Sequence, residues 1–210
     1  MRHKEIIIIG NIATGKSSLL ELLAKNLPAH PVYADELYKT NPFFQDALLD
    51  RKRWSLTSDL WFLTQRIQMT RAYQRKLSGS SMVVDSGVLM SFVYASSRRS
   101  TQTMTEVEWQ LYNNLYDVLT ADLAAPDLVI SLNAPVPLLL ERIKRRGREF
   151  EIKNHSAEYL ESLSKGQELL KEHLRSKKIP VLEVDAENTQ LLSSPAIVDR
   201  VWARLAKGAK

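Results

Sequence analysis

Short apolar runs recur along the chain, and longer segments of mixed polarity separate them. Branched aliphatic residues dominate these runs, as is typical of strands that are buried on both faces of a sheet. The runs predict five strands, at Glu5–Gly10, Pro31–Ala34, Met82–Asp85, Leu128–Asn133 and Val181–Asp185. The segments between them carry leucines and aromatic residues at helical spacing, which predicts helices at Gly15–Asn26, Leu56–Leu77, Glu106–Leu123, Pro137–Arg146 and Glu158–Ser176.

Strands that alternate with helices indicate a parallel sheet with helices on both faces. The expected fold class is therefore α/β, with a five-stranded parallel sheet. The sequence contains no linker, internal repeat or low-complexity segment, so we expect one domain over residues 1–210. The segment SSRRS, Ser96–Ser100, is interpreted as part of a loop.

The amino-acid composition agrees with an α/β domain and excludes several kinds of functional site. Hydrophobic residues make up 44% of the chain and charged residues 25%, values that indicate an ordinary globular domain. The sequence has no cysteine, which excludes disulfides and thiolate-bound metals. The early apolar run Ile6–Ile9 is too short for a signal-peptide core or a membrane span. We therefore expect a cytoplasmic protein with no membrane partner.

The net charge is +5, and much of the positive charge is concentrated in one segment, ERIKRRGR at Glu141–Arg148. A groove for a nucleic-acid polymer would spread its charge and interleave aromatic residues, so no such partner is expected. A local charge run on its own is usually a solvated helix face. Its meaning therefore depends on the rest of the sequence.

One motif carries specific chemistry. Gly10–Ser17 reads GNIATGKS, which matches G-x-x-x-x-G-K-[ST], and it lies between a predicted strand and a predicted helix. In this motif backbone N–H groups and the positive end of the helix dipole converge on phosphates. Lys16 is expected to reach the β- and γ-phosphates of ATP or GTP, and Ser17 to ligate Mg²⁺. The expected nucleotide contacts are Gly10, Asn11, Ile12, Ala13, Thr14, Gly15, Lys16, Ser17 and Ser18.

Phosphate-loop proteins include switches, motors and small-molecule kinases. A switch would carry an Asn-Lys-x-Asp segment, which this sequence lacks, and motors are usually larger. A chain of this size with an arginine-dense segment late in the sequence indicates a small-molecule kinase. In such enzymes a lid, here expected at about residues 144–152, brings arginines onto the transferring phosphoryl group.

Several longer stretches resemble one family. LLLERIKRRGREFE followed by AEYLESL resembles the lid and the following helix of the deoxynucleoside kinases, the family of deoxyadenosine, deoxyguanosine and deoxycytidine kinases. RWSLTSDLWFLTQRI, NPF and MTEVEWQLYNNLYDVL resemble further stretches in the family's order, from about Glu5 to about Asp185. The resemblance implies a kinase that phosphorylates the 5′-hydroxyl of a deoxynucleoside with ATP and Mg²⁺. It also implies a homodimer formed through the two long helices, Leu56–Leu77 and Glu106–Leu123.

The resemblance implies catalytic roles for several charged residues. Glu36, five positions before Asn41, falls on the carboxylate that accepts the proton of the 5′-hydroxyl, with Asp35 as the alternative base. Asp85 falls on an acidic residue associated with magnesium. A carboxylate at the carboxyl end of a buried parallel strand is also where such sheets bind ligands. The three arginines that fall on the family's lid arginines are Arg142, Arg146 and Arg148.

Substrate contacts follow from the same resemblance. Glu151 falls on the carboxylate that touches the sugar 3′-hydroxyl. Trp54 lies at the start of the helix that lines the base pocket. Asp59 falls where the family holds a base-reading glutamine. An ionised aspartate only accepts hydrogen bonds, so it favours a ring edge with adjacent donors, such as an amino group beside a protonated nitrogen, or a cationic substrate.

The sequence departs from the family at three acceptor-side positions. Besides Asp59, the family's sugar-contacting tyrosine is replaced near Leu48. Ser86 stands where the family has an arginine, and a serine cannot replace its charge or its fork of donors. Arg98 or Arg99 is a candidate to compensate.

These departures leave alternatives open. One is a kinase for a different small hydroxyl substrate, such as a modified nucleoside. Another is a nucleoside monophosphate kinase, in which four arginines, Arg51, Arg53, Arg98 and Arg99, could bind the acceptor phosphate. A third is a catalytically weakened nucleotide-binding protein, against which Glu36 and Asp85 argue, because a pure binding module needs no general base.

Overall fold

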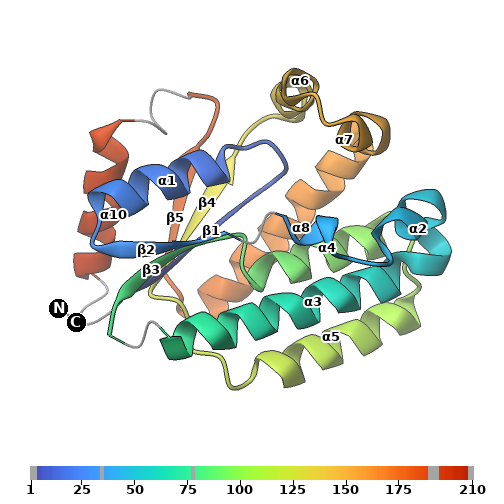
Figure 1. Ribbon diagram of the computed structural model, residues 1–210, viewed down its shortest axis with the longest axis horizontal. Helices are drawn as coiled ribbons and strands as arrows, with labels where there is room; N and C mark the ends of the chain where they lie inside the picture. The colour runs from blue at the N-terminus through green and yellow to red at the C-terminus, as the bar shows by residue number, and fades with distance from the viewer. Residues whose placement is uncertain (1–3, 34–35, 77–78, 189–193, 208–210) are drawn as a thin grey trace.

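One parallel sheet organises the molecule. The computed structural model describes residues 4–33, 36–76, 79–188 and 194–207. Its five strands are β1 (Glu5–Gly10), β2 (Ala29–Val32), β3 (Ser81–Asp85), β4 (Leu128–Asn133) and β5 (Val181–Asp185). They pair in the order β2-β3-β1-β4-β5, all parallel (Figure 1). The predicted α/β class with a five-stranded parallel sheet is confirmed.

The central strand shows why the apolar runs form this sheet. Every residue of β1 is buried. Because side chains alternate along a strand, Ile6 and Ile8 join the core on one face of the sheet, whereas Ile7 and Ile9 join the core on the other. Three strands have the predicted bounds, β3 begins one residue earlier, and β2 lies two residues before its predicted position.

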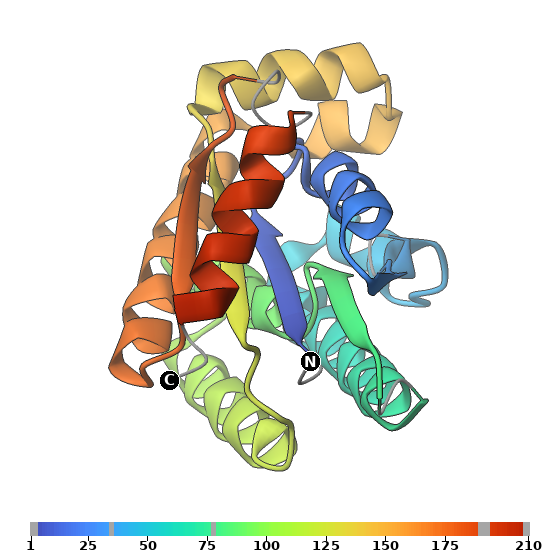
Figure 2. The same ribbon diagram turned by 90° about the vertical axis from the view of Figure 1, so that its left-hand side faces the viewer.

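Helices cover both faces of the sheet. On one face lie α1 (Lys16–Asn26) and α10 (Pro195–Lys207), the latter nearest the viewer in Figure 2. On the other lie α4 (Leu89–Ser100), α6 (Val136–Arg146) and α8 (Ala157–Ser176). A second layer, α3 (Arg51–Lys76) and α5 (Glu106–Thr120), packs on α4 (Figure 1). Three short elements complete the described chain: η1 (Leu37–Lys39), α2 (Phe44–Leu49) and α7 (Glu149–Asn154).

The five predicted helices are present, with shifted ends, but the prediction of a loop at Ser96–Ser100 is wrong. These residues form the end of α4. Three serines of this helix, Ser91, Ser96 and Ser97, are buried, so its packing face does not have the apolar spacing that predicts a helix. Among the described residues, no helix combines the length and the apolar character that crossing a membrane requires.

Candidate active site

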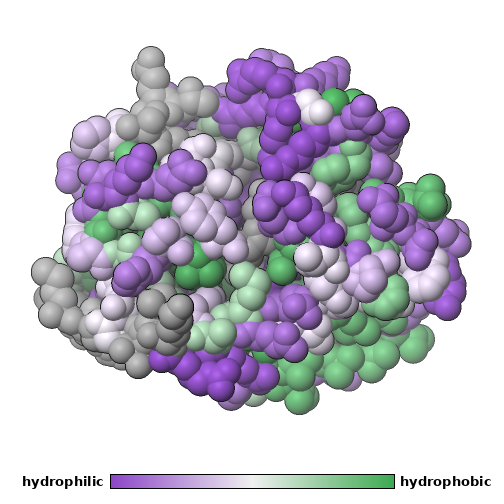
Figure 3. Space-filling view, viewed as in Figure 1, coloured by the Kyte–Doolittle hydropathy of each residue, from purple (hydrophilic) through white to green (hydrophobic). Residues whose placement is uncertain are grey.

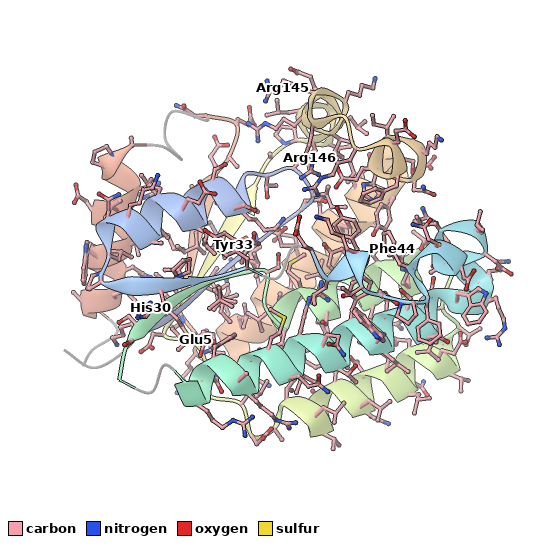
Figure 4. The ribbon with its side chains drawn as sticks, in the orientation of Figure 1. Glu5, His30, Tyr33, Phe44, Arg145 and Arg146 are labelled. Carbon is pink, nitrogen blue, oxygen red and sulfur yellow. The ribbon has the colours of Figure 1, made fainter. Side chains whose placement is uncertain are left out.

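A cavity of about 790 Å³ lies beside the carboxyl ends of β1 and β3. Open parallel sheets bind ligands at this edge, and the volume is in the range of small-molecule sites. Its wall combines the loop Ile12–Ser18 with residues of η1, α2, α3, α4, α6, α7 and α8. Lid residue Arg146 and α2 residue Phe44, both labelled in Figure 4, belong to this wall.

Close contacts shape the phosphate loop. A Cβ added at Gly10 would lie 2.6 Å from the Thr14 hydroxyl oxygen and 3.1 Å from the Leu132 carbonyl oxygen, so a side chain here would displace the loop. Gly15, the N-cap of α1, has φ 97°, and Ala13 also has a positive φ, 63°. Asn11 accepts from the Ile12 N–H and donates to the Leu160 carbonyl, which ties the loop to α8. Gly10 and Asn11 therefore shape the loop, whereas Ile12–Ser18 face the cavity.

The candidate metal position joins the loop to β3. The Ser17 hydroxyl donates to Asp85 Oδ2 at 2.8 Å, and the Ser86 hydroxyl donates to Asp85 Oδ1 at 2.8 Å. Asp85 is fully buried. A hydroxyl beside a carboxylate fits Mg²⁺, which prefers oxygen ligands and keeps several waters. The described residues hold no cluster of three or more acidic or histidine side chains for a metal, so phosphate and water oxygens would complete the shell.

Lys16 is buried in the loop itself. Its Nζ donates to the Asn11 carbonyl at 3.0 Å. When a nucleotide binds, its phosphate oxygens would replace this carbonyl as the hydrogen-bond partner of Lys16.

Two helices form the predicted lid. α6 ends at Arg146, the following Gly147 has a left-handed φ of 74°, and Arg148 is the N-cap residue of α7. Glu151, only 4% exposed, accepts from Arg146 and from Arg148 Nη1, the latter at 3.1 Å. Arg142 donates to the Ala186 carbonyl at 2.8 Å, beyond β5. All three predicted lid arginines and Glu151 line the cavity.

Glu36 lies beside the cavity rather than in its wall. It precedes η1, whose Leu37 and Tyr38 line the cavity. Its side chain is 66% exposed and accepts from Lys39 Nζ at 2.5 Å. This hydrogen bond, with the charge of Lys39, lowers the pKa of Glu36. Asp35, the alternative base, lies outside the described residues.

Trp54 and Leu48 also lie away from the cavity wall. The Trp54 ring stacks on Phe43 with centroids 5.9 Å apart, where α2 packs on the first turns of α3. Leu48 lies half-buried in α2. The apolar wall is built instead from Tyr38, Phe44, Phe62 and Phe150.

Asp59 is buried in the cavity wall with two arginines. It is 4% exposed, and its Oδ2 lies 3.6 Å from Arg98 Nε in an ion pair. Burial raises the pKa of Asp59, while the charges of Arg98 and Arg66 act in the opposite direction. Asp59, Phe62 and Arg66 are three and four residues apart, so they share one face of α3. This spacing could have revealed Phe62 and Arg66 from the sequence.

The model of the deoxynucleoside kinase family matches residues 6–207. The chain belongs to the deoxynucleoside kinase family. It is 27% identical to the deoxyguanosine kinase of Bacillus subtilis over 95% of each chain, and 32% identical to the deoxyadenosine kinase of Lactobacillus acidophilus over 70% of this chain and 68% of that one. A deoxyadenosine kinase structure from M. mycoides with bound dATP has the same fold, with TM-score 0.79 and 22% identity over 95% of this chain and 99% of that one.

The resemblance to the deoxynucleoside kinases, the expected fold and the expected enzyme class are therefore confirmed. This deoxynucleoside kinase is a phosphotransferase of the class that phosphorylates deoxynucleosides with a nucleoside triphosphate. The Ser17–Asp85 hydrogen bond and the predicted lid arginines lie at the same cavity as the phosphate loop.

The four arginines considered for an acceptor phosphate do not form one cluster in this kinase, although Arg51 and Arg98 both lie over the Tyr159 ring, each 5.3 Å from its centroid. Arg99 pairs with Glu106 at 2.8 Å on the surface, and the Arg53 guanidinium lies over the Trp54 ring. Arg51 donates to the Asn154 carbonyl. Of the four, Arg98 alone is a wall residue of the main cavity described here, and Asp59 opposes its charge.

Other wall residues were not predicted. Tyr94 comes from α4, Phe150 from α7, His155 from the residues that follow α7, and Tyr159 from α8. Phe150 and Tyr159 lie in stretches that resemble the family, but the sequence assigned them no role, and only the folded arrangement of α4, α7 and α8 brings these residues to one cavity.

Proposed function

We propose that this kinase transfers the γ-phosphoryl group of ATP to the 5′-hydroxyl of a deoxynucleoside, with Mg²⁺ bound between Ser17 and Asp85. The observation that carries the proposal is one continuous cavity, which has the phosphate loop and lid arginines in its wall together with a buried polar cluster at Asp59. Donor and acceptor can therefore be bound side by side. The two relatives described above, a deoxyguanosine kinase and a deoxyadenosine kinase, support a deoxynucleoside as the acceptor.

On the donor side, Lys16 and the loop N–H groups bind the β- and γ-phosphates. Mg²⁺, when bound, neutralises phosphate charge. Arg146 and Arg148 leave Glu151 to stabilise the transferring group, while the hydrogen bond of Arg142 to the Ala186 carbonyl keeps that arginine at the cavity wall.

On the acceptor side, the 5′-oxygen attacks the γ-phosphorus as the bond to the ADP oxygen breaks. The hydroxyl proton passes to the Glu36 carboxylate, which turns from Lys39 to reach it. Glu151, released by the arginines, binds the sugar 3′-hydroxyl, and Asp59 binds the base. Trp54 contributes indirectly, because it packs α2 against α3 and so supports Phe44 in the wall.

The test is phosphoryl transfer from magnesium-ATP to each of the four deoxynucleosides. We expect transfer to at least one, and a fall in kcat of about 100-fold or more for Glu36→Gln, because a general base contributes that much. Binding of ATP should be unchanged. Glu161→Gln, an exposed residue of α8, is the matched control. A protein that binds ATP and phosphorylates none of the four would contradict the proposal, and a fully active Glu36→Gln would transfer the base role to Asp35.

The proposal includes a homodimer formed through α3 and α5. Three apolar residues of α5, Val107, Leu111 and Val118, are exposed on its outer side, and Figure 3 shows an apolar area at the lower right, over the region of α5. A single domain over residues 1–210, a cytoplasmic location and the absence of membrane or nucleic-acid partners stay predictions.

A further inference from the structure

Four of the described wall residues of the cavity have a buried polar atom without a partner, and three of them, Asp59, Arg66 and Arg98, form one cluster. Asp59 Oδ2, Arg66 Nε and Arg98 Nε are buried and have no hydrogen-bond partner among the described residues. The Asp59–Arg98 contact of 3.6 Å is an ion pair, too long for a hydrogen bond. Buried polar groups are nearly always hydrogen-bonded, so these atoms leave hydrogen-bonding capacity that a ligand in the cavity can use.

These atoms come from two helices that are fixed relative to each other. Arg66 of α3 donates through Nη1 to the hydroxyl of Ser91 of α4 at 3.0 Å. Asp59 is 4% exposed and Arg66 7%, so both are almost fully out of solvent. Arg98, on α4, lies over the Tyr159 ring with its guanidinium carbon 5.3 Å from the centroid. The cluster is therefore a rigid polar surface rather than a set of mobile side chains.

Aromatic rings border this polar cluster. The Arg66 guanidinium lies over the rings of Phe62 and Tyr94, at 5.2 and 5.4 Å from their centroids. Phe44 stands edge-on to Phe62 and to Phe150, at 6.2 and 5.7 Å between centroids. All four rings line the cavity. Such a wall suits a flat aromatic ligand whose edge meets Asp59 and the arginines.

The charges of the cluster select the edge of that ligand. Ionised Asp59 accepts only, and the two arginines donate only. The ligand must therefore present adjacent donors to the carboxylate and acceptors to the guanidinium groups. Guanine has both, N1–H and N2–H₂ as donors and O6 and N7 as acceptors. Adenine and cytosine each place an unprotonated ring nitrogen beside their amino group, where it would face the carboxylate.

We propose that Asp59, Arg66 and Arg98 select guanine, so that deoxyguanosine is the preferred acceptor. Asp59 accepts from N1–H and N2–H₂, and the two arginines donate toward O6 and N7, the acceptor pair that arginine commonly recognises. This inference rests on the proposed function and names the base within its acceptor class.

The test compares kcat/KM for deoxyguanosine, deoxyinosine, deoxyadenosine and deoxycytidine. Deoxyinosine differs from deoxyguanosine only by the missing 2-amino group, so it should be about 10- to 100-fold weaker, the value of one hydrogen bond to a charged group. Deoxyadenosine should be about 100-fold weaker or more, because it leaves buried groups unpaired.

Asp59→Gln sharpens the test, because a glutamine amide both donates and accepts. It should lower kcat/KM for deoxyguanosine by about 100-fold and move the preference toward deoxyadenosine, whose amino group and N1 match the amide. Asp199→Gln, an exposed residue of α10, is the matched control. The deoxyinosine comparison uses the unaltered protein, so it decides the matter even if the variant does not fold.

Failure of this inference differs from failure of the proposed function. Transfer with a preference for deoxyadenosine, deoxycytidine or thymidine would overturn guanine selection and leave the kinase function standing. If no transfer occurs, calorimetric titration with deoxyguanosine and deoxyadenosine decides. Tighter deoxyguanosine binding that Asp59→Gln removes supports the inference, and equal or weaker binding overturns it.

Discussion

At the scale of single residues, the lid holds ionised groups that compete for the same partners. Arg146 and Arg148 both donate to Glu151, although the proposed reaction needs the arginines on the phosphoryl group and the glutamate on the sugar. A bound phosphate would exchange one set of charge-assisted hydrogen bonds for another. Loss of the arginines would in turn free Glu151 for a sugar hydroxyl, so donor and acceptor binding are coupled through this one residue.

His155 provides a pH prediction at this scale. Burial and the charges of Arg51, Arg146 and Arg98 lower its pKa to about 4. Its Nδ1 has no hydrogen-bond partner among the described residues, and the rings of Phe150 and Tyr159 pack against it. An unfolded histidine has a pKa of about 6.5, so the unfolded state binds more protons at acid pH. Stability should be unaffected above about pH 6.5 and should fall as the pH drops toward 4.

The measurement is urea unfolding at pH 7.5 and pH 5. His155 should cost the wild type about 2 kcal/mol between these two values, and His155→Gln should remove that part of the loss. Other titrating groups contribute equally to both proteins and cancel in the comparison. The exposed His30, shown in Figure 4, gives the control His30→Gln, which should behave as wild type. An equal pH dependence in His155→Gln and wild type would disprove the assignment.

Residues in a contiguous motif were the ones that the sequence could place. The conformation of the loop Gly10–Ser17 depends on local features. A glycine stands where the backbone makes a close contact, and the loop joins a strand to a helix, so both features can be recognised in a short stretch of sequence. The orientation of the Glu36 side chain could not be predicted from the sequence, because it depends on the hydrogen bond from Lys39. The ion pair of Asp59 with Arg98 could not be predicted either, since Arg98 reaches Asp59 only through the packing of α4 on α3.

At the scale of elements, α4 and α8 approach closely through small residues. A Cβ added at Gly166 of α8 would lie 2.9 Å from the Val93 carbonyl oxygen of α4. The Ser97 and Ser162 hydroxyls meet at 2.5 Å across the same contact. The three central strands, β1, β3 and β4, were predictable because their apolar residues are nearly contiguous, whereas α4 was missed because it packs partly through serines and alanine. Apolar periodicity does not report such a contact.

The contact gives a prediction for Gly166→Ala. In an ordinary helix this change stabilises by about 1 kcal/mol. Here the new methyl group meets backbone of α4, so we expect a loss of about 1–3 kcal/mol in the free energy of unfolding. Urea unfolding measures it, with the neighbouring exposed Lys165→Ala as control on the same helix. A more stable Gly166→Ala would show that α4 and α8 do not pack this closely.

At the scale of the whole molecule, strand order determines where the site forms. The phosphate loop follows the central strand β1, and Asp85 ends the neighbouring strand β3, so parallel pairing brings Ser17 and Asp85 to one edge. The alternation of strands and helices predicted a parallel α/β sheet, but it did not predict the order of the strands in that sheet. The pairing β2-β3-β1-β4-β5 depends on which helices cover which face, and that needs the complete set of helices, including α4 and α10.

The proposed homodimer is tested at this scale by one substitution on α5. Val107, Leu111 and Val118 are 76%, 49% and 72% exposed, and their spacing places them along one side of the helix. In a two-fold symmetric dimer the same residues of both subunits lie at the interface. Leu111→Arg would therefore place two positive charges there and remove the apolar contacts of both leucines. Sedimentation velocity should show a wild-type particle of twice 24.0 kDa and a Leu111→Arg monomer.

Leu169→Arg is the matched control, because Leu169 of α8 is equally exposed, at 49%, on a different helix. It should leave the dimer intact, and both variants should keep the wild-type circular dichroism spectrum, since neither side chain belongs to the buried core. A dimer that persists in Leu111→Arg, or one that both variants dissociate alike, would place the contact elsewhere. A monomeric wild type at micromolar concentration would mean that the apolar residues of α5 are simply solvated, as scattered surface apolar residues often are.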